Sequence, residues 1–102
     1  MRAKLVGIAL CIALLHAFGA HAEPAHRALI RSILKDPESA KFADDRQSAR
    51  GTNVWCGTVN AKNGFGGYGG PKRYVVFLAD NDFNFEHPKD DKFAGRWRLY
   101  CE

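Results

Sequence analysis

The chain has 102 residues, which is enough for one small domain and no more. Its formal net charge of +4 reflects a slight excess of basic over acidic side chains. A nucleic-acid binder shows a concentrated basic patch instead, so we expect no nucleic-acid partner.

The first 22 residues have the features of a cleaved signal peptide. Arg2 and Lys4 precede an apolar run at 5–15, and a small-x-small pattern ends at Ala22. An uncleaved membrane anchor is the alternative, but the run falls short of the ~20 residues that a span needs. We therefore predict cleavage after Ala22, a single domain at 23–102, and a periplasmic or secreted bacterial protein. That mature chain carries 13 basic and 11 acidic side chains.

Two cysteines remain after cleavage, Cys56 and Cys101. Small exported domains have marginal cores and fold in an oxidising compartment, so such cysteines usually pair. We predict a structural disulfide between them, since neither a Cys-x-x-Cys pattern nor a zinc spacing is present.

The mature chain begins with a predicted helix at 24–35. Apolar residues recur at four-residue steps along one face: Ala25, Leu29 and Ile33, with Ile30 and Leu34 beside them. A basic stripe of Arg27, Arg31 and Lys35 follows the other face, which we take as solvated, with attraction to an anionic membrane or a partner as the alternative. We expect no ligand role for His26.

Asp36 and Pro37 end this helix, because the residue before proline is pushed out of the α region. Asp36 is then predicted to cap a short helical turn, after which Phe42 returns to the core. The polar segment 44–52 is either an edge strand or a loop.

Three strands are predicted next, at 54–61, 74–79 and 83–86. The first alternates, with Val54 and Cys56 on one face and Trp55 on the other. Its Gly57 indicates a bulge or the close approach of another element, such as an aromatic ring. The second strand is apolar on both faces and should lie centrally.

A last helix is predicted to start at Asp90 or Asp91, with Phe93, Trp97 and Cys101 at helical spacing, although the same residues could alternate along a strand. The fold class is therefore α+β. We expect an antiparallel sheet of three to four strands, covered by an N-terminal and a C-terminal helix and closed by one disulfide.

The segment 60–71 holds five glycines and two aromatic residues, and it fits neither a phosphate-binding loop nor a dinucleotide fingerprint. Its exposed aromatics could contact a sugar or a peptide; alternatively, Phe65 and Tyr68 fold back onto the sheet while glycines supply positive φ angles. The candidate contact residues are Asn60, Lys62, Asn63, Phe65, Tyr68, Lys72 and Arg73.

No catalytic set is evident. His87 lies near Asp90 and Asp91, which defines an alternative, a small metal-dependent hydrolase, but these residues follow no recognised ligand spacing. We expect no enzyme activity, no cofactor and no bound metal.

Three stretches together resemble a group of small exported proteins of proteobacteria that lack an assigned function. These are LKDPESAKF at 34–42, CGTVNAKNGFGGYGG at 56–70, and the C-terminal pattern of Phe93, Trp97 and Cys101. The resemblance implies the pairing of the two cysteines and the last helix, and it brings no catalytic residues. The chain departs from the group in its extra loop residues Gly64, Gly69 and Pro71.

We therefore expect a small exported binding or interaction module without catalysis. Its loop would contact an envelope protein or a glycan, and any membrane contact would be peripheral at most.

Overall fold

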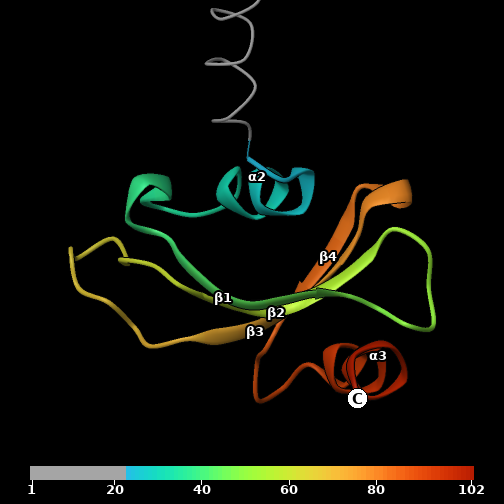
Figure 1. The fold of residues 1–102 in the computed structure, drawn as a ribbon. Coiled ribbons are helices and arrows are strands. Elements are labelled where there is room, and N and C mark those ends of the chain that lie inside the picture. The colour runs from blue at the N-terminus through green and yellow to red at the C-terminus, as the bar shows by residue number, and fades with distance from the viewer. Residues whose placement is uncertain (1–22) are drawn as a thin grey trace, which may run out of the picture.

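Four strands form one antiparallel sheet with a helix on each face (Figure 1). The computed structural model describes residues 23–102; the predicted leader at 1–22 lies outside them. The elements follow in the order α2 (Ala25–Arg31), η1 (Pro37–Ser39), β1 (Lys41–Gln47), β2 (Val54–Asn60), β3 (Lys72–Phe77), η2 (Leu78–Asp80), β4 (Asp82–Phe85) and α3 (Asp91–Cys101). The strands pair in sequence order, β1-β2-β3-β4, which confirms the predicted α+β class.

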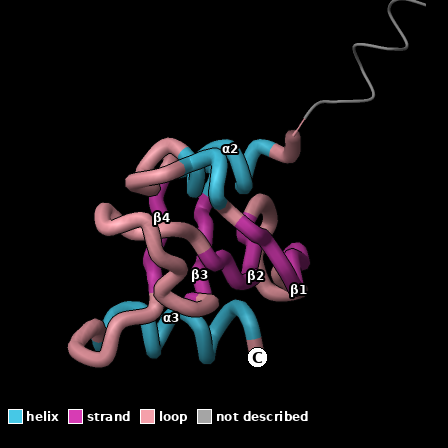
Figure 2. The backbone as a smooth tube through the Cα atoms, turned by 90° about the vertical axis from the view of Figure 1, so that its left-hand side faces the viewer, coloured by secondary structure: helices cyan, strands magenta, loops and turns pink. Residues whose placement is uncertain are grey.

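The two faces of the sheet carry separate cores. Figure 2 shows the sheet between α2 and α3. Facing α2, Ile30, Tyr74 and Val76 are fully buried. Facing α3, Val75 and Phe93 pack with Val54. Strands β2 and β3 alternate between the two cores because successive side chains point to opposite faces. The predicted faces of β2 and the central place of β3 are confirmed.

Helix α2 differs from the prediction in its length and its buried face. It ends at Arg31 rather than residue 35, because the next turn tightens: Ile33 N donates to Ile30 O at 3.2 Å, and Leu34 N donates to Arg31 O at 3.2 Å. His26 and Ile30 are its buried residues, whereas Ile33 is 41% exposed. The predicted apolar face is confirmed at Leu29, Ile30 and Leu34, which pack in the core, and is wrong at Ala25 and Ile33, which are exposed.

The segment after α2 contains both structures that the sequence left open. Residues 41–47 form the edge strand β1, and 48–53 form a turn. The turn η1 is present, but the predicted cap is wrong: the side chain of Asp36 makes no capping hydrogen bond, and its backbone oxygen accepts from Ser39 N and Ser39 Oγ instead.

Gly57 lies where β1 bulges and where an aromatic ring crosses the sheet. The register passes from Ala43↔Thr58 to Arg46↔Cys56, so Asp44 and Asp45 together oppose Gly57. On the other side Gly57 pairs with Tyr74, and a Cβ at Gly57 would lie 2.5 Å from the Tyr74 hydroxyl oxygen. Only glycine lets this ring cross, which confirms the predicted close approach.

Helix α3 is attached to the sheet by the predicted disulfide. Asp90 caps its first turn, with Oδ1 accepting from Phe93 N at 3.0 Å. Cys56 of β2 and Cys101 in its last turn are bonded, with their Cα atoms 5.8 Å apart. None of the helices in residues 23–102 has the length and apolar character that a membrane crossing needs.

Candidate functional site

The loop between β2 and β3, residues 61–71, is held in one shape by hydrogen bonds. Lys62 pairs with Tyr68 as an antiparallel bridge, which makes a small hairpin of its own. At its turn Asn63 N donates to Gly67 O at 2.9 Å, and Asn63 Oδ1 accepts from Phe65 N at 2.9 Å. Gly66 lies at φ +82°, a conformation that favours glycine.

Three further hydrogen bonds fix this hairpin to the domain. Ser39 accepts twice, from Lys62 N at its hydroxyl (2.8 Å) and from the Tyr68 hydroxyl at its backbone oxygen (3.0 Å). Asn60 Oδ1 accepts from Gly70 N at 3.1 Å. The loop is thus attached both to its own strand and to the turn η1.

The two loop aromatics behave differently. Phe65, at the tip, is 100% exposed, so the expectation that it folds back is wrong for this residue. Tyr68 is 41% exposed and has two ammonium groups near its ring, with Lys41 Nζ 4.5 Å and Lys62 Nζ 5.8 Å from the ring centroid.

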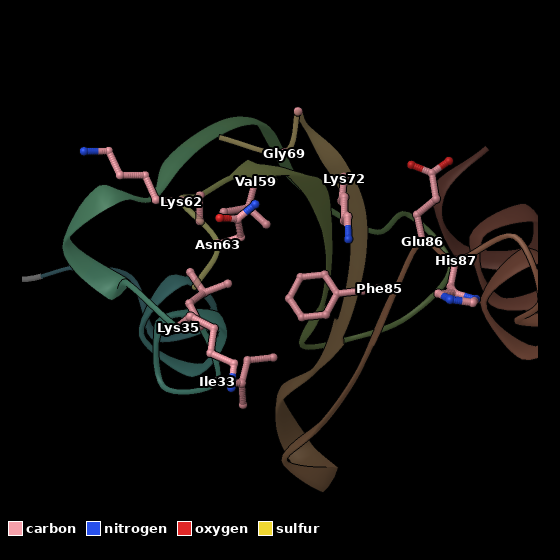
Figure 3. A pocket seen from close by; sticks show the side chains of 13 residues that line it. Ile33, Lys35, Val59, Lys62, Asn63, Gly69, Lys72, Phe85, Glu86 and His87 are labelled. Atoms are coloured by element: carbon pink, nitrogen blue, oxygen red, sulfur yellow. The ribbon is translucent and has the colours of Figure 1, made fainter. Parts of the chain in front are cut away.

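A cleft of about 410 Å³ lies between this loop, the turn that follows α2, the start of β3 and the end of β4. Figure 3 shows the ring of Phe85 at its centre, Ile33 and Lys35 on one side, and Glu86 and His87 on the other. Lys72 points toward the Phe85 ring, whereas Lys62 points away from the cleft (Figure 3). The cleft therefore combines an apolar floor with lysines at its margin.

We use the name loop face for the exposed part of the loop at 61–71 together with the side chains beside it. It consists of the exposed apolar residues Ile33, Phe65 and Tyr68 and the lysines Lys35, Lys41, Lys62 and Lys72. No ion pair among residues 23–102 involves any of these four lysines. The sequence predicted three of its residues from the loop itself, Lys62, Phe65 and Tyr68, along with the adjacent Lys72.

Two other predicted contact residues have different roles. Asn60 is half-buried and orients the loop. Arg73 is directed to the opposite side of the sheet: its guanidinium donates to Glu86 Oε2 at 2.7 and 2.9 Å and lies over the Trp97 ring at 4.9 Å. The hydrogen bond from Arg73 is the main reason that the pKa of Glu86 lies below its usual range.

The basic stripe of α2 is mostly occupied by internal contacts. Arg27 pairs with Asp45 and Arg31 with Glu23, and both guanidinium groups lie over the Phe42 ring at 5.0 and 5.3 Å. Only Lys35 remains directed to the loop face, so the stripe is not a continuous surface for an anionic partner.

The proposed metal ligands also serve other purposes. His87 Nδ1 accepts from Lys89 N at 3.1 Å, and Asp90 caps α3. Within residues 23–102 no three His, Cys, Asp or Glu side chains gather as a metal site would require. The geometry therefore gives the metal-dependent alternative no ligand set.

Sequence reasoning missed a buried polar cluster beneath α2. Asp45 Oδ2 accepts from Arg27 Nε at 2.8 Å and from the Tyr74 hydroxyl at 3.0 Å, and lies 2.7 Å from His26 Nε2. His26 is 2% exposed and stacks on Trp55 with ring centroids 4.2 Å apart. The cluster does not line the cleft described above. It also does not line a second cleft next to it, which Arg73, His87 and Phe93 line, so we assign the cluster a structural role.

The pKa values in this cluster reflect its burial and its hydrogen bonds. Burial favours the neutral carboxyl of Asp45, but hydrogen bonds from Arg27, His26 and Tyr74 outweigh it, so its pKa lies below the usual range. Burial, reinforced by the charge of Asp45, raises the pKa of Tyr74. The aspartate is thus charged and the tyrosine neutral at neutral pH.

Comparison of the chain with protein-family models, curated proteins and solved structures found no match. The functional argument therefore rests on the geometry of the site.

Proposed function

We propose that this protein is an exported, non-catalytic binding module that contacts a component of the cell envelope through its loop face. The observation that carries the proposal is the full exposure of Phe65 at the tip of a loop fixed by hydrogen bonds. Exposing a large aromatic side chain to water costs roughly 2 kcal/mol relative to burying it. A loop that is held in shape loses little further entropy when it binds, so its exposed aromatic is suited to anchor a contact.

Export is supported by two features of the chain. The leader pattern at 1–22 is typical of a signal peptide. The disulfide between Cys56 and Cys101 is of the kind that persists in oxidising compartments.

A photo-crosslinking experiment tests the proposed contact. We expect the exported protein with p-benzoylphenylalanine in place of Phe65 to give discrete crosslinked products in living cells. The matched control places the same probe at Leu99, which is 49% exposed on α3 and outside the loop face. The proposal would be wrong if position 65 gave no product, or only the products seen at position 99.

A further inference from the structure

The apolar surface of residues 23–102 is concentrated on the loop face. Large hydrophobic side chains are exposed at Ile33, Phe65, Tyr68 and Leu99, and the first three belong to this face. Ile33 lines the cleft beside the loop, and Tyr68 is bonded to the turn η1. Two of the three thus belong to one loop and the third lines the cleft beside it, a grouping of the kind that interaction surfaces have.

The charge around these apolar groups is positive. The loop between Asn60 and Lys72 contains no acidic residue. The acids of the turn to which Tyr68 bonds are the half-buried Asp36, just before it, and the exposed Glu38, and the four lysines of the loop face outnumber them. Glu86, across the cleft, is already paired with Arg73. The face is therefore complementary to an anionic surface.

The internal contacts of the loop face argue against a glycan as its partner. Of the two loop aromatics only the exposed Phe65 offers an open ring for a sugar to stack on, because the Tyr68 ring already has the ammonium groups of Lys41 and Lys62 near it. The side-chain carbonyls of Asn60 and Asn63 already accept backbone hydrogen bonds within the loop. These two carbonyls are therefore already engaged and do not serve to orient the hydroxyl groups of a sugar.

We propose that the envelope component is an anionic phospholipid surface, which the protein contacts peripherally. Phe65 enters the interface between headgroups and acyl chains, and the lysines reach lipid phosphates while their alkyl stems lie along apolar surface. A protruding, fully exposed phenylalanine suits a fluid bilayer, because the bilayer needs no preformed pocket to accept it. This inference rests on the proposed function, since it uses the same face.

Binding to lipid vesicles tests the inference. The protein used is the exported form, purified after the cell has processed it. We expect it to sediment with vesicles of phosphatidylglycerol and phosphatidylethanolamine and not with phosphatidylcholine, and to be released as salt screens the charges. The double variant Lys62→Gln, Lys72→Gln should bind about 20-fold more weakly, and Phe65→Ala about 10-fold more weakly.

The controls remove equivalent groups elsewhere. Lys92→Gln with Arg98→Gln removes two exposed charges of α3, and Leu99→Ala removes an exposed apolar side chain of the same helix. Both should bind like the wild type. Equal binding to both kinds of vesicle, equal losses in the controls, or no binding would overturn the inference. If vesicles fail to bind while position 65 still crosslinks to a protein, the proposed function stands and the partner is that protein.

Discussion

Replacing Asp45 by alanine should lower the free energy of unfolding by about 3 kcal/mol, which is large for a domain of this size. Its Oδ2 is the common partner of His26, Arg27 and Tyr74, at 2.7, 2.8 and 3.0 Å. Removing it leaves the buried imidazole and hydroxyl without this partner, and unsatisfied groups of this kind cost more than a lost hydrogen bond contributes. Urea unfolding measures the loss.

An isosteric pair separates the role of the Asp45 charge from that of its shape. Asp45→Asn should destabilise the domain clearly, whereas Asp44→Asn should change stability little, because Asp44 is exposed and asparagine tolerates its φ of +57°.

The acid dependence of stability gives a second readout. The pKa of Asp45 lies below the ordinary value of 3.8 in the folded state. Its charge therefore stabilises the domain at pH values above 3.8, and this contribution is lost as the pH falls further. The Asp45→Asn variant should lack that part of the acid dependence. Equal stability of both variants would contradict the structural role of the cluster.

Removing the disulfide is the second change with a large expected effect. Cys56 and Cys101 close a loop with a sequence separation of 45, and in the chain-entropy model such a bond contributes about 4 kcal/mol. The variant Cys56→Ala, Cys101→Ala should therefore be largely unfolded at 37 °C, with α3 detached from the core that Phe93 and Val75 form. Thermal unfolding followed by circular dichroism measures this.

Reducing agent provides a control that leaves the sequence unchanged. It should destabilise the wild type to a similar extent and leave the alanine variant unaffected. Intact mass before and after alkylation confirms which form is present, and it also locates the cleavage site that we predict after Ala22. A reduced wild type as stable as the oxidised protein would show that the core holds α3 without the bond.

Much of the fold follows from local pattern. The alternation of Val54, Trp55 and Cys56 fixed the two faces of β2, and Gly57 indicated the ring that crosses it. The capping residue Asp90 and the spacing of Phe93 and Trp97 indicated α3. In each case a short stretch carries its own physical signal.

The features that sequence reasoning missed depend on distant residues. Asp45 reaches His26 and Tyr74 at a bulge of β1. The surrounding segment is polar and has no hydrophobic periodicity from which a bulge could be predicted. The loop is likewise fixed by Ser39, which precedes Lys62 by 23 residues and Tyr68 by 29.

The loop at 61–71 presents Phe65 from a backbone that hydrogen bonds hold in one shape. Backbone ¹⁵N relaxation of the exported protein tests this directly, because order parameters report motion of each amide on the picosecond to nanosecond timescale. Values near about 0.85 through the loop, similar to those of β2 and β3, are the result that we predict. Values below about 0.6 at Asn63, Phe65 and Gly67 would show a flexible loop and would contradict the account.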